Sequence, residues 1–202
     1  MAEVGIIGAG SWGTALSLLL YKNGNQVTVW SALENEIQML KEEREQKDKL
    51  PGVKLPEDMI FTTNLEKAIK GKDVLVLAVP SPFTRSTSAK MKPYVKDGQI
   101  IVNVAKGIEE TTLMTLSEII EEEIPQANVA VLSGPSHAEE VGRGLPTTIV
   151  AGSKDKATAE YLQNLFMSEV FRVYTSSDVL GIELGAALKN VVARSEEHTS
   201  EL

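Results

Sequence analysis

The chain has 202 residues, of which 43% are hydrophobic and 24% charged, and its formal net charge is −8; these values predict a globular protein of one or two domains. The acidic balance and the absence of a run of Lys and Arg exclude a surface for nucleic acid or for anionic membranes. There is no cysteine, which excludes disulfides, thiolate metal sites and cysteine nucleophiles, and the lack of a signal peptide or bilayer-spanning run predicts a soluble cytoplasmic protein.

Short apolar segments recur between longer polar stretches and predict strands buried on both faces. Continuous β-branched runs are typical of a parallel sheet that helices cover on each side. The predicted strands are residues 3–7, 26–30, 73–79, 99–105, 128–133 and 147–151.

The segments between these strands predict helices, so strand and helix alternate along the chain. The predicted helices are residues 11–22, 33–46, 65–70, 83–91, 113–123 and 156–166. Residues 50–56 contain two prolines and a glycine and predict a loop. The alternation indicates an α/β fold with a doubly wound, mostly parallel, Rossmann-like sheet.

The end of the chain divides into two parts. Residues 178–193 carry apolar side chains among small ones and predict a long buried helix. Residues 194–202 abandon this pattern without a glycine stop and are interpreted as a non-native tail, such as a translated adapter. We therefore expect one domain over residues 1–193, with the apolar face of its last helix either exposed or covered by a substitute partner if the natural chain continues.

The motif Gly8-Ala9-Gly10-Ser11-Trp12-Gly13 lies between the first predicted strand and the first predicted helix. The simplest explanation is a tight turn of small residues, but this context favours a dinucleotide site. Gly8 permits the turn, Gly10 lets a diphosphate approach, Gly13 lets helix and strand pack closely, and Ser11 offers a hydroxyl donor.

The second predicted strand ends without an obvious group to read the adenosine ribose. A carboxylate is usual there for NAD and an arginine for NADP. This chain has Ala32 and Leu33, and the nearest acid, Glu34, is more typical of a helix-dipole partner. The cofactor prediction is therefore NAD or NADP.

Polar residues follow several other predicted strands. Lys106 follows the strand at 99–105, and the run from Ser133 to Glu140 offers hydroxyl and amide donors for a phosphate or a polar substrate. His137 within that run is interpreted as a surface histidine beside two glutamates. Lys189 interrupts the last apolar helix, where a solvated lysine and a substrate-binding ammonium both remain open. No cluster of residues suggests a metal.

Read together, these segments resemble the bacterial NAD(P)-dependent glycerol-3-phosphate dehydrogenase family. The match extends over residues 1–193, and its two family-specific blocks are residues 171–174 and Gly181-Ile182-Glu183-Leu184-Gly185-Ala186-Ala187-Leu188-Lys189-Asn190. The other matching blocks are residues 8–16, 78–80, 106–109, 132–140 and 145–148.

The resemblance implies hydride transfer between NAD(P)H and dihydroxyacetone phosphate, which yields sn-glycerol 3-phosphate for phospholipid synthesis. It implies that Lys189 is the catalytic acid and base and that Lys106 contacts both substrate and cofactor. The residues implied to contact substrate are Lys106, Gly134 and Ser136. Those implied to contact the cofactor are Gly8, Gly10, Ser11, Trp12, Gly13, Lys106 and Ala138.

Two features depart from the family pattern. Family members often carry His or Arg at the positions of Ala32 and Leu33, and an aromatic residue at the position of Lys49, whose charge is a possible substitute. The family's C-terminal helical domain, which holds the substrate phosphate, is missing here. We expect a fragment with little or no turnover of an enzyme that can be a homodimer at full length; the alternatives are a 3-hydroxyacid-type dehydrogenase and a non-catalytic dinucleotide-binding module.

Overall fold

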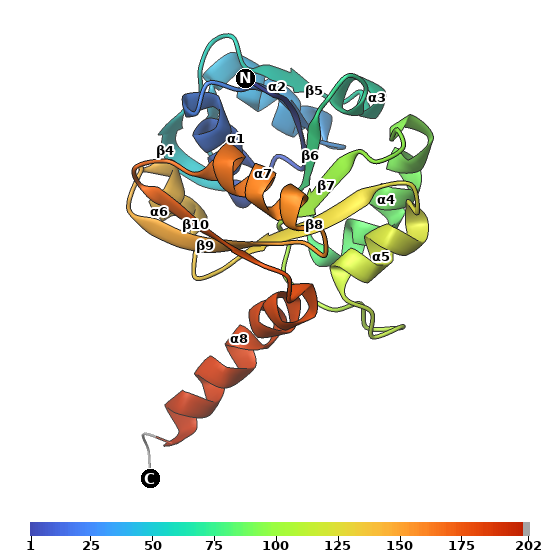
Figure 1. The fold of residues 1–202 in the computed structure, drawn as a ribbon. Helices are drawn as coiled ribbons and strands as arrows, with labels where there is room; N and C mark the ends of the chain where they lie inside the picture. The colour runs from blue at the N-terminus through green and yellow to red at the C-terminus, as the bar shows by residue number, and fades with distance from the viewer. Residues whose placement is uncertain (200–202) are drawn as a thin grey trace.

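A single eight-stranded sheet forms the centre of the molecule, and helices cover both of its faces (Figure 1). The computed structural model describes residues 1–199. The strand order is β10-β9-β8-β7-β6-β1-β2-β5, and all neighbours are parallel except β8 and β9. The predicted doubly wound, mostly parallel sheet is therefore confirmed.

The strands of this sheet are β1 (Glu3–Ile7), β2 (Gln26–Trp30), β5 (Ile60–Thr62), β6 (Val74–Leu77), β7 (Ile100–Asn103), β8 (Asn128–Ser133), β9 (Thr147–Gly152) and β10 (Phe171–Ser176). The helices are α1 (Ser11–Lys22), α2 (Glu34–Glu43), α3 (Leu65–Ile69), α4 (Thr84–Met91), α5 (Leu116–Glu123), α6 (Ala138–Gly142), α7 (Lys156–Phe166) and α8 (Val179–Thr199). Among the described residues, no helix has the length and hydropathy needed to cross a membrane.

Two apolar cores lie on opposite faces of the sheet. One contains side chains of α1, α2, α6 and α7, and the other contains side chains of α3, α4 and α5. The central strands β1, β6 and β7 contribute to both cores, because their side chains alternate between the two faces. This double burial is the reason that their sequences are continuous apolar runs.

The prediction of a loop at residues 50–56 is wrong. Leu50–Lys54 forms β4, which pairs antiparallel with β3 (Glu45–Gln46) in a small hairpin outside the main sheet. The predicted helix at 33–46 accordingly ends at Glu43, because Arg44 adopts a left-handed conformation with φ of 50° and turns the chain into β3. Gly52 has a φ of 81° and bends strand β4. The composition of this segment alone suggested a loop.

The sequence pattern also missed two strands, β5 and β10, which form the two edges of the sheet. An edge strand is paired on one side only, and β10 alternates buried and exposed residues instead of forming a continuous apolar run. A search for continuous runs therefore identifies the central strands and passes over the edges.

The prediction that the helix at 178–193 is buried is wrong for most of its length. Val179 and Glu183 are buried, but Leu180, Leu188 and Val191 are 54%, 47% and 65% exposed. The helix packs against β8 and β9 through its first turns and then projects away from the domain (Figure 1). It also continues past residue 193 to Thr199, and residues 200–202 of the predicted tail lie outside the described residues.

The antiparallel pairing of β9 with β8 determines the direction of α8. Val131 pairs with Gly152 and Ser133 with Val150, so β9 and β10 run away from the carboxyl end of β8. The following helix therefore runs back toward that end. Its first turns lie on β9, since a Cβ on Gly152 would meet Ile182, and Ala186 reaches the end of β8 at Ser133.

Candidate active site

The turn after β1 requires glycine at two positions. Gly8 has a φ of 125°, and its amide donates to Trp30 O at 2.9 Å, which ties the turn to the end of β2. A Cβ on Gly8 would lie 2.7 Å from the carbonyl of Ala78, and one on Gly13 would lie 2.0 Å from Gly8 O. The backbone of α1 thus approaches the turn more closely than any side chain allows.

Gly10 is different, because a Cβ built on it would meet nothing within 4 Å. It is the N-cap of α1 and has no side chain to cap the helix, so it supplies no acceptor for the first-turn amides. Half-buried Ser11 and Trp12 form the start of that turn. Uncapped amides, a positive helix end and free space are the features that a diphosphate requires, so the residues present fit a dinucleotide.

At the end of β2 the structure places a carboxylate that the sequence pattern missed. Glu36, in the first turn of α2, accepts a hydrogen bond from Ser31 Oγ at 2.6 Å and forms an ion pair with Lys49. Glu34, the acid nearest to the strand in sequence, is exposed at the start of α2. No sequence pattern indicated this role, because the burial of Glu36 on α2 becomes visible only in the fold.

A second group of residues lies at the ends of β7 and β8. Asn103, the last residue of β7, binds both the amide and the carbonyl of Ala105 through its side chain, at 3.1 and 3.2 Å. This closes the turn that presents Lys106, whose Nζ donates to Gly134 O at 3.1 Å after β8. Ser136 Oγ donates to the same carbonyl at 3.4 Å. Three of the predicted substrate residues are therefore brought together.

Lys189 of α8 belongs to this group. Partial burial lowers the pKa of Lys106 below its usual value, and the positive charge of Lys189 lowers that pKa further. Lys189 itself is exposed. Two positively charged side chains from segments far apart in the sequence thus belong to one group, and such a group favours an anionic ligand.

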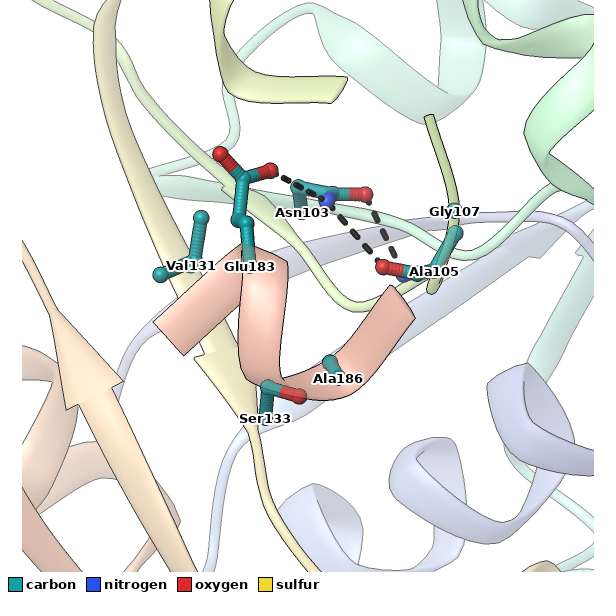
Figure 2. Close-up of a pocket in the computed structure, with 7 residues that line it drawn as sticks. All are labelled: Asn103, Ala105, Gly107, Val131, Ser133, Glu183 and Ala186. Carbon is teal, nitrogen blue, oxygen red and sulfur yellow. Dashed lines mark hydrogen bonds between the residues drawn. The ribbon is translucent and has the colours of Figure 1, made fainter. Parts of the chain in front are cut away.

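The first turns of α8 are fixed by Glu183, a buried carboxylate that is 6% exposed. It accepts hydrogen bonds from the amide of Ser117 at 2.9 Å and from Ser117 Oγ at 2.5 Å, at the N-terminus of α5. It also accepts from Asn103 Nδ2 at 3.4 Å. Figure 2 shows Glu183 reaching from α8 toward Asn103, with Ala186 further along the helix near Ser133. Glu183 and Asn103 connect the helix of Lys189 with the turn of Lys106.

The remaining predicted residues lie beside the glycine turn. Ala138 is the buried first residue of α6, and α6 packs against α1. Its N-cap His137 is exposed, in agreement with its interpretation as a surface residue. The loop after β6 joins the two groups, because a Cβ on Gly107 would meet Ser81 Oγ at 2.8 Å and one on Gly8 would meet Ala78. Both groups thus lie at the same end of the sheet, where its parallel strands have their carboxyl ends.

Three comparisons with known proteins agree. A family model described as NAD-dependent glycerol-3-phosphate dehydrogenase N-terminus matches residues 3–159. The chain is 68% identical over 193 residues to a glycerol-3-phosphate dehydrogenase (NAD(P)+) of Agathobacter rectalis, covering 96% of this chain and 57% of that protein. It is 56% identical over 195 residues to the protein of that name from Fusobacterium nucleatum, covering 96% and 58%.

The structure leads to the same family. It superposes on the crystal structure of glycerol-3-phosphate dehydrogenase from Coxiella burnetii with a TM-score of 0.90 and 32% sequence identity, over 95% of this chain and 59% of that one. The chain thus spans less than two thirds of the length of the relatives that it matches. The glycine turn, the lysine group and these matches together show that the chain belongs to the glycerol-3-phosphate dehydrogenase family.

Proposed function

We propose that this chain provides the coenzyme-binding and proton-donating part of an NAD(P)-dependent glycerol-3-phosphate dehydrogenase, which reduces dihydroxyacetone phosphate to sn-glycerol 3-phosphate for phospholipid synthesis. One observation carries the proposal. Lys106, in the turn after β7, donates to Gly134 O at 3.1 Å, and Glu183 of α8 accepts from Asn103 at the start of that turn, so the helix that carries Lys189 is bonded to the turn that carries Lys106. An anionic ketone substrate matches such a pair of cations.

The glycine turn holds the coenzyme in this proposal. Gly10 leaves room for the diphosphate, the amides of Ser11 and Trp12 face it, and Gly8 and Gly13 allow the backbone to take this form. Ala138 lies beside this turn at the start of α6. The bound nicotinamide supplies the hydride for the reaction.

The lysines act on the substrate. An ammonium at Lys189 donates a proton to the carbonyl oxygen and stabilises the negative charge that develops there. Lys106 adds a second positive charge and is held by Gly134 O. Gly134 and Ser136 line the turn after β8, where a polar substrate group finds hydrogen-bond partners. Glu183 and Asn103 position the two lysines, because their hydrogen bonds connect α8 with the turn after β7 and with the start of α5.

We further propose that residues 1–193 are the domain, that the 202-residue chain alone has little or no turnover, and that the complete enzyme is cytoplasmic and can form a homodimer. A substrate held on one side only is poorly oriented for reaction. Gel filtration of the complete enzyme and cell fractionation test the last two points.

Titration tests the function directly. NADH and NADPH are added separately to the 202-residue chain while nicotinamide fluorescence is measured, and dihydroxyacetone phosphate is then added while absorbance reports oxidation. We expect saturable binding without oxidation. Rapid oxidation would show that the chain is a sufficient catalyst, and failure of both coenzymes to bind would overturn the proposed function.

A further inference from the structure

We propose that Glu36 sets the coenzyme preference of this chain toward NAD(H), by holding Lys49 in an ion pair at the end of β2. The inference rests on the proposed function for the presence of a dinucleotide and goes beyond it in choosing between the two coenzymes. It depends on the contacts among three side chains, Ser31, Glu36 and Lys49. They lie on three separate segments: the residue after β2, helix α2 and the hairpin of β3 and β4.

The contacts of Glu36 leave little freedom to its carboxylate. The side chain is 9% exposed, accepts from Ser31 Oγ at 2.6 Å and pairs with Lys49, which is itself 48% exposed. Ser31 Oγ also accepts from the amide of Leu33 at 3.1 Å, which fixes the first residues after the strand. A carboxylate this buried needs a cationic partner, so Lys49 is engaged by Glu36 rather than free.

These groups lie where the adenosine ribose is read. In dinucleotide-binding sheets that position is the carboxyl end of the second strand, next to the glycine turn. Here Trp30, the last residue of β2, accepts from Gly8 N at 2.9 Å, and Ser31 follows it directly. The hairpin that carries Lys49 is fixed to the same turn, because Gln46 Nε2 donates to Ala9 O at 2.8 Å.

The charge balance favours a ribose without a phosphate. NADP(H) brings a 2′-phosphate, which would need a free cation here, but Ala32 and Leu33 carry no charge and Lys49 is paired. Moving Lys49 to that phosphate would leave Glu36 buried beside a second anion. The ribose of NAD(H) carries neutral hydroxyls at this point, and a carboxylate that already accepts two hydrogen bonds retains lone pairs to accept another.

Dissociation constants of the 202-residue chain for NADH and NADPH, measured by fluorescence and calorimetry, test this without any turnover. We expect NADH to bind at least about tenfold more tightly than NADPH. Glu36→Gln releases Lys49 and removes the repelling charge, so it is expected to tighten NADPH binding by about tenfold and to change NADH binding much less.

Three further variants keep the test decisive. Glu42→Gln removes an exposed carboxylate from the same helix, where it contacts Gln38, and is expected to leave the ratio of the two constants unchanged. Glu36→Gln combined with Lys49→Met is expected to lose the gain in NADPH affinity. Lys49→Met alone leaves the carboxylate of Glu36 without its cation, so it is expected to lower the free energy of unfolding in urea and to widen the preference for NADH. The ratio of the two constants in the unaltered chain tests the inference even if a variant fails to fold.

The outcomes separate the inference from the proposed function. Equal affinity of the unaltered chain for the two coenzymes, an equal shift in Glu36→Gln and Glu42→Gln, or an unchanged ratio in Lys49→Met would each overturn the role of Glu36 while leaving the dehydrogenase proposal intact. If neither coenzyme binds, the proposed function fails and this inference fails with it.

Discussion

The coenzyme end of the sheet and helix α8 are built in opposite ways. In the first, Ala15, Leu16 and Leu20 of α1 are fully buried and the glycine turn is tied to β2 by a backbone hydrogen bond. In the second, Lys189 stands on a helix that packs through its first turns and exposes large apolar side chains beyond them. The difference indicates that the proposed dinucleotide site is held by many contacts within this chain, whereas the position of Lys189, the proposed proton donor, depends on few.

The largest expected effect concerns Lys189. Residues 1–193 fused to the remaining part of the Agathobacter rectalis relative provide a complete chain, in which Lys189→Met removes the proposed proton donor. We expect kcat/KM for dihydroxyacetone phosphate to fall about 10²- to 10⁴-fold, with the dissociation constant for NADH nearly unchanged. Lys156→Met, which removes an exposed lysine of α7, is the control. Survival of turnover in Lys189→Met would show that another group donates the proton.

The next effect separates folding from binding at the glycine turn. Gly13→Ala places a methyl group 2.0 Å from Gly8 O, and we expect a loss of about 3 kcal/mol in the free energy of unfolding because the helix must shift away. Gly10→Ala meets no atom within 4 Å, so its stability should stay within about 0.5 kcal/mol while coenzyme binding weakens.

Urea unfolding followed by circular dichroism and NADH titration measure the two quantities for each glycine variant. A Gly10→Ala chain that binds NADH normally would contradict the placement of the diphosphate. A Gly13→Ala chain of normal stability would contradict the close approach of α1 to the turn.

A smaller effect is expected at the base of α8. Glu183→Gln replaces a charged acceptor of two hydrogen bonds from Ser117, so the free energy of unfolding should fall by about 1–3 kcal/mol. Amide hydrogen exchange in the first turns of α8 should accelerate, with NADH binding kept. In the fused chain kcat should fall more than KM rises, since Lys189 is mispositioned. If Ser117→Ala and Glu183→Gln prove strictly additive, the two side chains do not act together.

The smallest effect is a dependence on acid. Arg85 donates to both oxygens of Glu109, at 2.9 and 2.8 Å, and lowers the pKa of that carboxyl from its ordinary 4.5 to about 2. A lowered folded-state pKa contributes stability above the unfolded value, and this is lost as the pH falls from about 4.5 toward 2. Arg85→Met should therefore flatten the decline of urea midpoints in acid.

The control for the acid experiment is Lys154→Met, which breaks an exposed pair with Glu121 of α5. An exposed pair contributes little to stability, so its profile should follow that of the unaltered chain. Identical acid profiles for Arg85→Met and the unaltered chain would show that the Arg85 contacts do not lower the pKa of Glu109.

The fold was predictable where its determinants are local. The bounds of α1, β2, β8 and α7 agree with the sequence prediction, because an apolar pattern and nearby turn residues define each of them. The hairpin of β3 and β4 was not predicted, since Pro51 and Gly52 are typical of loops. The burial predicted for α8 was wrong for most of the helix, because an apolar pattern does not reveal whether a partner surface exists.

The same distinction applies to the site. Gly8, Gly10 and Gly13 were recognisable from their spacing, whereas the roles of Lys106 and Lys189 were implied only by the family resemblance, because a solvated lysine is ordinary at either position. Asn103 and Glu183 were not recognised, because each acquires its role from a partner far along the chain; they lie 80 residues apart. Similarly, Glu36 has a meaning only when Lys49 folds back onto it.

The reversal at β9 has a consequence for the order of folding. The glycine turn and β2 are joined by short chain closures, whereas the contact between Asn103 and Glu183 closes a loop of 80 residues and carries a larger entropic cost. The glycine turn and its contact with β2 should therefore form early, and α8 should dock late. Substitutions at Glu183 should then accelerate unfolding far more than they slow refolding, while those at Gly13 should slow refolding itself.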